Sequence, residues 1–491
     1  MLPPVILDNG VIRTLDPQLP LSRALAVAGE RFAGGVGVHE TALASPELVD
    51  LRGRCVLPGF TDAHVHFPSW ALARKELRLE GATSLEETLT RIAEAASGAA
   101  AGWLRGGGWR AGDWADGAEP TKEALDAVAP NVPVALESRD RHALWLNSAA
   151  LAEANAPEST GLLREEAAWD FRARHLIPTA DEFLVAIREG QRVAASRGVT
   201  AIHDFDGPFA LPLWQRLRRE ESLTQRVWQS LPADRLGALA TLDFAARFGD
   251  DMLRLGPLKV FLDGTLGSGT ALLLDGSGLE LTTRTELEEL IRGAAALDFP
   301  VAVHAIGDGA NRNTLDAFEA TRETWQPRGL RQRIEHAQLL APQDIARFAE
   351  LGIAASVQFS HAPADRELAA RAWGGRLEGA YAYRALWDAG AVLVNGSDAP
   401  VEELDPLAGV RAAVERDAPL TVEEALLATT VHPAWLTGEE RRRGKLLPGH
   451  LADLVVLDRD PLTCPPEELE AVEVVSTMVA GRWVFNPPPW D

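Results

Sequence analysis

Residues 57–66 of this chain read Leu-Pro-Gly-Phe-Thr-Asp-Ala-His-Val-His, which places Asp62, His64 and His66 at alternate positions behind a Pro-Gly turn. In an extended strand, side chains two positions apart point to the same face. The two imidazoles therefore converge on one point, with the Asp62 carboxylate on the same side. Two imidazole nitrogens offered from one strand are typical of a divalent-metal site, and the stretch predicts a metal-binding strand.

Short β-like runs alternate with helical segments on either side of this stretch. The helical segments begin with capping-box patterns, Ser84-x-x-Glu87, Thr179-x-x-Glu182 and Thr285-x-x-Glu288, ahead of apolar residues at helical spacing. The predicted strands are Cys55–Phe60, Val199–His203, Arg226–Ser230, Leu258–Leu262, Pro300–His304, Arg331–His336, Ile353–Gln358 and Ala391–Asn395. Eight strand–helix units predict an α/β fold, a closed (β/α)8 barrel of the TIM type.

The sequence at the two ends of the chain has a different pattern, which predicts short strands separated by turns. Asn9-Gly10 lies between two apolar runs and predicts a hairpin over residues 5–13, and Ala480-Gly481 predicts another over residues 474–485. A few strands at each end are unstable alone, so we expect one small β-sandwich domain from residues 1–57 plus 440–491. The barrel would then occupy residues 58–439, with an inserted subdomain at about residues 68–190, after barrel strand 1.

Composition limits the function classes. The chain has 491 residues and a net charge of −23, and this acidic balance disfavours nucleic acid and anionic membranes as partners. The N-terminus has no signal-peptide pattern, and no apolar run reaches 18 residues. Cys55 and Cys464 could pair if the ends meet, but free thiols suit a cytoplasmic chain better. We expect a cytoplasmic protein acting on a small molecule; a homodimer is compatible with this.

In barrels of this type, active sites lie at the C-terminal ends of the strands. An isolated His-x-His motif more often marks a solvated strand, but here chemistry-bearing residues recur at the predicted strand ends. Lys259 lies in predicted strand 4, His304 ends strand 5, His336 ends strand 6, and Asp398 follows strand 8. His203–Asp206 ends strand 2, where such residues more often pack or fix a loop, so we leave it outside the site.

These motifs together resemble the amidohydrolase superfamily of metal-dependent hydrolases. The closer resemblance is to its amidohydrolase-3 or YtcJ-like branch, which includes N-substituted formamide deformylases. It covers nearly the whole chain and rests on residues 58–66, 259–270, 303–309, 333–338, 396–405 and 444–458.

The resemblance implies a role for each candidate residue. His64 and His66 would hold the more buried metal, and His304 and His336 the second. Lys259 would be carboxylated and bridge both metals, because a lysine cation cannot ligate whereas a carbamate offers two anionic oxygens. Asp398 would bind the first metal and act as the general base. The metals would be two zinc ions, although the same ligands accept Mn, Fe, Ni or Co.

Each assignment has a purely structural alternative. Lys259 could be a barrel-interior lysine paired with Asp263, His304 and His336 could be core histidines, and Asp398 could cap a turn. His142, in Arg139-Asp-Arg-His142 of the inserted segment, matches a motif of the same branch. It would bind substrate or stabilise an oxyanion, or else have a local structural role. Trp109, in the run Gly106–Arg110, would line an apolar substrate entrance or belong to a packed loop.

The leading hypothesis is therefore a hydrolase of a C–N bond in an amide, an N-substituted formamide or a cyclic imide. The alternative is a deaminase of an amino-substituted heterocycle that uses one metal. That branch lacks a bridging lysine and often carries a glutamate after the strand-5 histidine, whereas this chain has Lys259 and continues His304-Ala-Ile-Gly-Asp. A non-catalytic scaffold is disfavoured because all six metal positions are filled.

Overall fold

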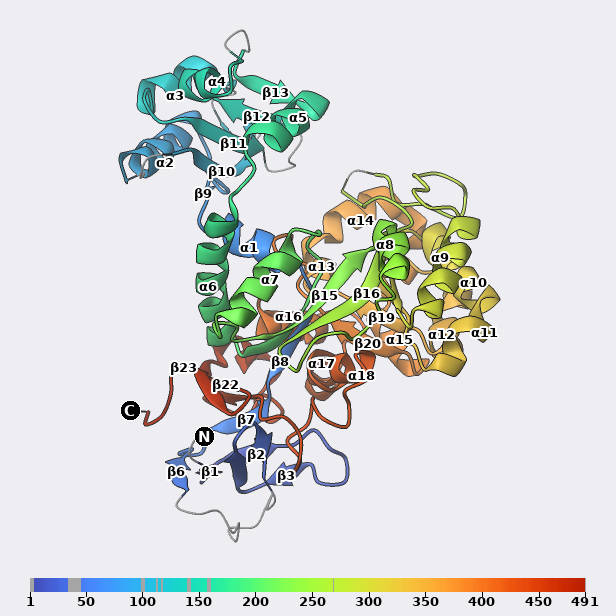
Figure 1. Ribbon diagram of the computed structural model, residues 1–491. Helices are drawn as coiled ribbons and strands as arrows, with labels where there is room; N and C mark the ends of the chain where they lie inside the picture. The colour runs from blue at the N-terminus through green and yellow to red at the C-terminus, as the bar shows by residue number, and fades with distance from the viewer. Residues whose placement is uncertain are drawn as a thin grey trace. The chain divides into compact units, whose positions relative to one another are not determined.

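The computed structural model describes residues 4–33, 46–98, 102–111, 114–115, 118–138, 143–156, 160–267 and 269–490 (Figure 1). It divides into two compact units. The first, called the barrel unit below, comprises residues 1–67 and 188–491, and the second, called the inserted unit, comprises residues 68–187.

Eight parallel strands form the central sheet of the barrel unit, in the order β20-β19-β18-β17-β16-β15-β14-β8. The strands are β8 (Phe60–Val65), β14 (Val199–Asp204), β15 (Arg226–Pro232), β16 (Leu253–Phe261), β17 (Val301–Ala305), β18 (Arg333–His336), β19 (Ala354–Val357) and β20 (Val392–Asn395). Backbone hydrogen bonds join the chain at the ends of the two outer strands, from Asp398 N to His64 O (2.7 Å) and from His66 N to Ala399 O (2.9 Å). The sheet is a nearly closed barrel, which confirms the predicted (β/α)8 fold.

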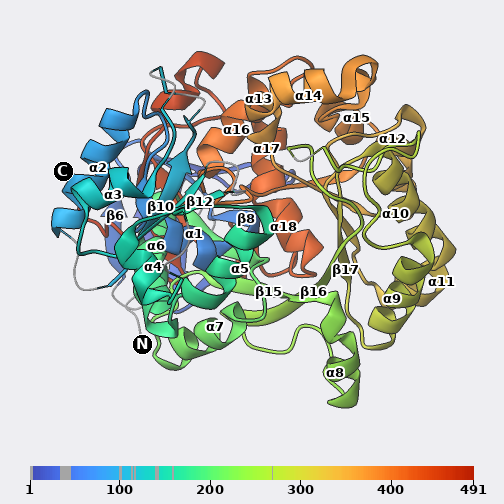
Figure 2. The same cartoon turned by 90° about the horizontal axis from the view of Figure 1, so that it is seen from above.

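Helices follow the barrel strands along the chain. Figures 1 and 2 both show α9 to α12 side by side, outside the strands. The helices are α6 (Ala180–Ser196), α7 (Ala210–Arg219), α8 (Leu236–Thr241), α9 (Arg284–Ala296), α10 (Asp308–Ala320), α11 (Arg322–Trp325), α12 (Pro342–Leu351), α13 (His361–Ala364), α14 (Arg366–Trp373), α15 (Tyr383–Asp388), α16 (Pro406–Val414), α17 (Val422–Thr429) and α18 (Val431–Leu436). Short 3-10 segments occur at Ala233–Arg235, Gln326–Arg328, Gly374–Gly379 and Pro466–Ala471.

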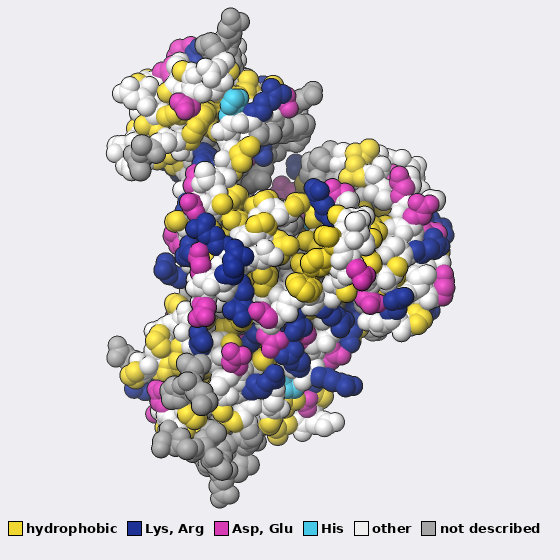
Figure 3. All heavy atoms as spheres, viewed as in Figure 1, with side chains coloured by type: hydrophobic (Ala, Val, Ile, Leu, Met, Phe, Trp, Pro, Cys, Tyr) yellow, Lys and Arg dark blue, Asp and Glu magenta, His cyan; other side chains and the backbone are white. Residues whose placement is uncertain are grey.

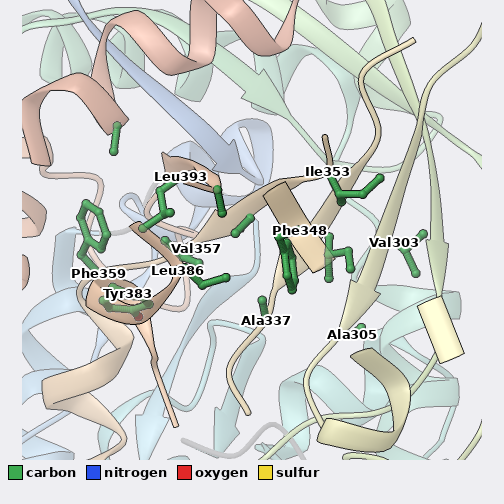
Figure 4. Packing of buried hydrophobic residues seen from close by; sticks show 14 of the residues in the cluster. Val303, Ala305, Ala337, Phe348, Ile353, Val357, Phe359, Tyr383, Leu386 and Leu393 are labelled. Carbon is green, nitrogen blue, oxygen red and sulfur yellow. The ribbon is translucent and has the colours of Figure 1, made fainter. Parts of the chain in front are cut away.

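The core of the barrel unit consists of apolar side chains from the strands and from the helices that cover them. Val303 of β17, Val357 of β19 and Leu393 of β20 are fully buried, and Phe348 of α12 and Leu386 of α15 pack in the same cluster (Figure 4). Burial of a side chain of this size stabilises the fold by about 1.5–3 kcal/mol. The continuous apolar character of these strands follows from burial on both faces.

Two of the three predicted helix starts form where the sequence places them, but of these two only Thr179 and Glu182 make a complete capping box, since the Glu87 carboxylate accepts from Thr83 N (2.9 Å) in place of Ser84 N. The Ser84 hydroxyl accepts a hydrogen bond from Glu87 N (3.1 Å), and Thr179 and Glu182 exchange both capping bonds. The third prediction is displaced by two residues, because α9 begins after Thr283, which exchanges both capping bonds with Glu286. The pattern occurs twice in this segment, and Thr283 has the extended backbone that an N-cap requires.

Strands from both ends of the chain form two further sheets of the barrel unit. One has the order β5-β4-β1-β6 and the other β23-β22-β21-β7-β2-β3. Their strands are β1 (Val5–Asp8), β2 (Val11–Arg13), β3 (Leu21–Ser22), β4 (Leu25–Ala28), β5 (Arg31–Phe32), β6 (Glu47–Asp50), β7 (Cys55–Pro58), β21 (Leu454–Leu457), β22 (Val474–Val479) and β23 (Arg482–Phe485). Buried residues of both sheets, Leu7 and Val27 of one and Val56 and Val456 of the other, belong to one apolar cluster.

Two local predictions at this end are wrong. The runs on either side of Asn9-Gly10 form no hairpin, because β1 pairs with β4 and β6 whereas β2 pairs with β3 and β7. The predicted first barrel strand, Cys55–Phe60, is mostly β7, which pairs with β2 and β21. The barrel strand begins at Phe60, and His64 lies within it. The C-terminal hairpin of β22 and β23 is confirmed.

The inserted unit contains a mixed sheet in the order β13-β12-β11-β10-β9. Its elements are α1 (Phe67–Ala73), β9 (Leu77–Arg78), α2 (Leu85–Gly98), β10 (Leu104–Trp109), α3 (Lys122–Val128), β11 (Val134–Ser138), β12 (Ala143–Leu146), α4 (Ser148–Glu153), β13 (Leu162–Arg164) and α5 (Glu165–His175). Trp109, Trp114 and Trp145 pack against one another at its centre, with ring centroids 5.8–6.3 Å apart.

The surface and the cysteines fit the composition. In the view of Figure 3, basic and acidic side chains are interspersed with apolar ones, with no large field of one sign. Both Cys55 and Cys464 are free. Within the described ranges, every helix is too short or too polar to span a lipid bilayer.

Candidate metal centre

Strand β8 and the turn after β20 bring two histidines and a carboxylate together. His64 and His66 point to the same side, as their alternate spacing predicts, and Nε2 of each lies 3.5 Å from Asp398 Oδ1. His64 is 1% exposed and Asp398 is 7% exposed. The three ligand atoms lie close enough together to share one metal ion.

His304 at the end of β17 and His336 at the end of β18 lie beside this group. The two ring centroids are 4.5 Å apart, and the His336 ring is 5.0 Å from that of His64. Both side chains are buried, with 6% exposure. The four histidines predicted from the sequence therefore converge on one place, as expected for residues at the C-terminal ends of neighbouring barrel strands.

The second nitrogen of each imidazole decides whether the ring can bind a metal. A ring nitrogen that donates its hydrogen to an oxygen leaves the other nitrogen with a free lone pair. All four rings have such an oxygen close to one nitrogen: Glu335 Oε2 at 2.6 Å from His64 Nδ1, Asp206 Oδ1 at 3.5 Å from His66 Nδ1, the Gly264 carbonyl at 3.0 Å from His304 Nε2 and Gln358 Oε1 at 2.9 Å from His336 Nδ1. In the neutral ring, the remaining nitrogen of each imidazole carries the lone pair that a divalent cation requires.

The electrostatics of the cluster favour a cation. Burial lowers the pKa of His64 to about 4 and that of His304 to about 3, so both imidazoles are neutral at physiological pH. Burial also opposes the charged form of His66, but hydrogen bonds and charge from Asp206 and Asp398 raise its pKa to about 10. Burial opposes the ionisation of Asp398 as well, yet the surrounding imidazoles hold its pKa well below the usual range. The neutral nitrogens of His64 and His304 and the ionised oxygens of Asp398 fit a divalent metal, whereas His66 would give up a proton on binding it.

Lys259 of β16 lies next to the same histidines. Its Nζ is 5.0 Å from the centre of the Phe205 ring and 4.9 Å from that of Phe261, and these rings contact His64 and His304. Burial lowers the pKa of Lys259 to about 8, which increases the fraction of neutral amine at physiological pH. The structural alternative, an ion pair with Asp263, does not form, since that carboxylate accepts backbone N–H groups of Leu272, Ile306 and Gly307.

The backbone at two of these positions adopts a conformation that is costly for residues with a side chain. His336 has φ +74° and Asp398 has φ +56°, both in the left-handed region. Such a residue costs on the order of 1–3 kcal/mol, and such strain concentrates at functional sites. Asp62 supports the Asp398 turn, because its Oδ1 accepts the backbone N–H groups of His64 (3.2 Å) and Ser397 (3.0 Å).

Sequence reasoning missed several residues of this cluster. His361, the first residue of α13, forms a potential ligand group with His336 and Asp398. It follows strand β19 at a helix start, where no alternate spacing singles it out. Glu335 lies within strand β18 and was not singled out, and Asp206 was set aside as a loop residue. A buried acid next to a predicted ligand, as in Glu335-His336, is a signal that could have indicated a supporting role.

The inserted segment holds two of the predicted site residues. His142 lies outside the described residues. Trp109 is 5% exposed, and its Nε1 donates to the Leu136 carbonyl (2.9 Å) within the inserted unit. That burial gives Trp109 a packing role, and contact of Trp109 with a substrate stays a prediction.

A nearly closed barrel with buried histidines and an aspartate at its strand ends is the architecture of a metal-dependent barrel hydrolase. Comparison with known proteins agrees. Residues 47–485 match a family model described as "Amidohydrolase family". The chain belongs to this family, and its class is that of the amidohydrolase-superfamily hydrolases.

Individual relatives resemble the chain over nearly its whole length. It is 30% identical to Protein LONG AFTER FAR-RED 3 of Arabidopsis thaliana (98% of this chain and 91% of the relative). It is 29% identical to the putative amidohydrolase YtcJ of Bacillus subtilis (93% of each) and 28% identical to the N-substituted formamide deformylase of Arthrobacter pascens (97% of each). Among solved structures, an uncharacterized metal-dependent hydrolase from Pyrococcus furiosus superimposes with a TM-score of 0.82 at 31% identity, covering 94% of this chain and all of that one.

Proposed function

We propose that this protein hydrolyses a C–N bond of a small molecule, namely an amide, an N-substituted formamide or a cyclic imide, with two divalent metal ions. The observation that carries the proposal is that four imidazoles from neighbouring strand ends each have an oxygen acceptor beside one ring nitrogen, which leaves the other nitrogen of a neutral ring available to a metal. A core histidine needs no such arrangement, whereas a metal ligand does.

The residues divide into two ligand sets. His64, His66 and Asp398 would hold one ion, and His304 and His336 the other. Lys259, as an N6-carboxylated side chain, would bridge the two with its carbamate oxygens. Bound divalent ions polarise a carbonyl group and lower the pKa of a coordinated water toward 7, which supplies a nucleophile at neutral pH.

The chain's own residues then handle the protons. The water oxygen adds to the carbonyl carbon and gives up a proton to Asp398. As the C–N bond breaks, Asp398 returns that proton to the departing nitrogen, so that an acid and an amine are formed from one amide and one water. His142 would stabilise the negative charge on the carbonyl oxygen.

The named relatives favour this reaction class. A protein named as an N-substituted formamide deformylase is 28% identical to this chain in an alignment that covers 97% of each. Its name prompts N-substituted formamides as the first substrates to test, followed by acylated amines and cyclic imides. A deaminase that uses one metal is the second candidate, and Lys259 beside His304 disfavours it.

The decisive experiment combines metal analysis with a substrate panel. We expect two equivalents of a divalent metal per chain and release of formate and amine from at least one N-substituted formamide. The Asp398→Asn variant should keep its metal and lose at least ~10²-fold in kcat, whereas exposed Asp275→Asn serves as the matched control. One equivalent of metal with ammonia release from an amino heterocycle would indicate the deaminase instead. A chain that binds no divalent metal would refute both.

A further inference from the structure

A fifth imidazole belongs to the cluster. His361 is 5% exposed, and its Nε2 lies 3.9 Å from Asp398 Oδ2. Its ring is nearly parallel to that of His336, with an interplanar angle of 7° and centroids 6.4 Å apart. His361 therefore borders the place where a substrate carbonyl would meet the second pair of histidines, His304 and His336.

The nitrogen polarity of His361 is opposite to that of the four other rings. Its Nδ1 lies 3.2 Å from Nε2 of Gln338, an amide nitrogen that can only donate. His361 Nδ1 therefore accepts a hydrogen bond, and in the neutral ring the hydrogen is on Nε2. His336 shows the reverse, because its Nδ1 faces the Gln358 oxygen at 2.9 Å. Two glutamines thus set neighbouring histidines to opposite tautomers.

The Nε2 hydrogen of His361 is available. Among the described residues, this nitrogen is buried and has no hydrogen-bond partner. The 3.9 Å separation from Asp398 is too long for a hydrogen bond. A buried donor without a partner is costly, so such groups in a native site commonly meet a ligand.

We propose that His361 is a hydrogen-bond donor to the carbonyl oxygen of the scissile bond and binds no metal. This inference rests on the hydrolytic function proposed above. During attack, that oxygen gains negative charge next to His336, and the His361 Nε2–H is directed at this space. Donors of this kind matter most in the transition state, so they act on kcat more than on KM.

Substitution at His361 separates a donor from a ligand. The His361→Leu variant should keep both metal equivalents with unchanged affinity, while kcat falls ~10²–10³-fold and KM changes little. His361→Gln, which retains an amide donor, should recover at least a tenth of the activity that is lost. His336→Leu is the control that should lose metal. Loss of metal from His361→Leu, similar to that control, would overturn the proposal.

The tautomer can be read without any substrate. Long-range ¹H–¹⁵N NMR of the zinc-loaded protein, with the His361 signals assigned through His361→Gln, should show the hydrogen on Nε2. In Gln338→Glu, a carboxylate replaces the amide donor, so the hydrogen should move to Nδ1 and kcat should fall as in His361→Leu. A wild-type hydrogen on Nδ1 would identify His361 as a ligand-type ring and contradict the proposal.

These readouts separate the two proposals. The metal content of the variants and the tautomer of His361 are both measured without any substrate. If the loaded protein turns over no C–N substrate and yet shows the Nε2–H tautomer and full metal content in His361→Leu, the proposed function fails and the donor assignment stands.

Discussion

Glu335 Oε2 lies 2.6 Å from Nδ1 of His64, and both side chains are almost completely buried. The carboxylate is also held by Arg333, whose Nη2 donates to Oε2 at 2.9 Å. Glu335 thus fixes the orientation of His64 and directs its Nε2 toward Asp398. The neighbouring arginine and imidazole outweigh the cost of burial and keep the pKa of Glu335 well below its usual range.

Removal of this charge should weaken metal binding. In Glu335→Gln the amide keeps the size of the side chain but loses the anion that makes His64 a stronger ligand, so zinc affinity should fall about 10- to 100-fold. Chelator competition measures this. Glu440→Gln is the matched control, because Glu440 makes a two-bond pair with Arg331 at the surface. Equal zinc affinity in Glu335→Gln and wild type would show that Glu335 does not tune the site.

Chemical rescue should reveal the state of Lys259. Lys259→Ala should lose activity and part of its metal, because the bridging anion is missing. Short carboxylates such as propionate should restore part of both, since they supply two oxygens in place of a carbamate. Lys259→Arg, which keeps the positive charge and cannot form a carbamate, should not be restored by propionate. Full activity in Lys259→Arg would rule out the bridging role.

The buried ion pair between Arg226 and Asp453 should contribute strongly to the stability of the fold near neutral pH. Arg226 donates to both oxygens of Asp453, at 2.7 and 2.9 Å, and both side chains are buried. Asp453→Asn leaves the arginine without its counter-charge, so the free energy of unfolding should fall by about 3–5 kcal/mol at pH 7. Urea unfolding measures this, and Asp298→Asn, in an exposed pair with Arg328, should change it by less than about 1 kcal/mol.

The pH dependence of the Asp453 effect has a definite sign. Burial opposes ionisation of Asp453, but Arg226 and Arg443 lower its pKa in the folded state below the ordinary 3.8. A lowered folded pKa contributes stability that is complete above the unfolded pKa and is lost as the pH falls through the folded value. The difference between wild type and Asp453→Asn should therefore be constant above about pH 5 and shrink at lower pH. A difference that grows on acidification would contradict this assignment.

Gly396 is required by the close approach of strand β20 to His64. A Cβ at this position would lie 2.3 Å from the backbone nitrogen of His64. Gly396→Ala must displace that backbone, so it should cost about 1–3 kcal/mol of stability and lower the metal affinity. Urea unfolding and zinc titration measure the two effects. Gly237→Ala, in the open helix α8, is the control and should be neutral or stabilising.

Much of the barrel could be predicted because its strands are apolar runs followed by polar turns. The candidate metal ligands could be picked out because they stand at those strand ends. The first strand was misplaced because Cys55–Pro58 and Phe60–Val65 are two β-like runs with only Gly59 between them, and their different pairing partners assign them to different sheets. The Asn9-Gly10 turn predicts a hairpin locally, whereas β1 and β2 find better partners in two different sheets.

The supporting residues of the site were harder to predict for a different reason. Gln338, Gln358 and His361 act through contacts between segments that follow neighbouring strands, and no spacing within one segment reveals such contacts. His361 opens a short helix, where a histidine is equally typical of an ordinary helix start. Only the folded positions show that its Nε2 turns toward Asp398.

A single residue, Gly59, separates β7 of the outer sheet from β8 of the barrel. Strand β7 is held by β2 and β21, so the outer sheet anchors one end of the segment that carries His64 and His66. A chain shortened to the barrel alone would release that anchor, and we expect its zinc affinity to drop even though every ligand is still present. We therefore expect the terminal strands to position the candidate metal-binding strand in addition to forming sheets of their own.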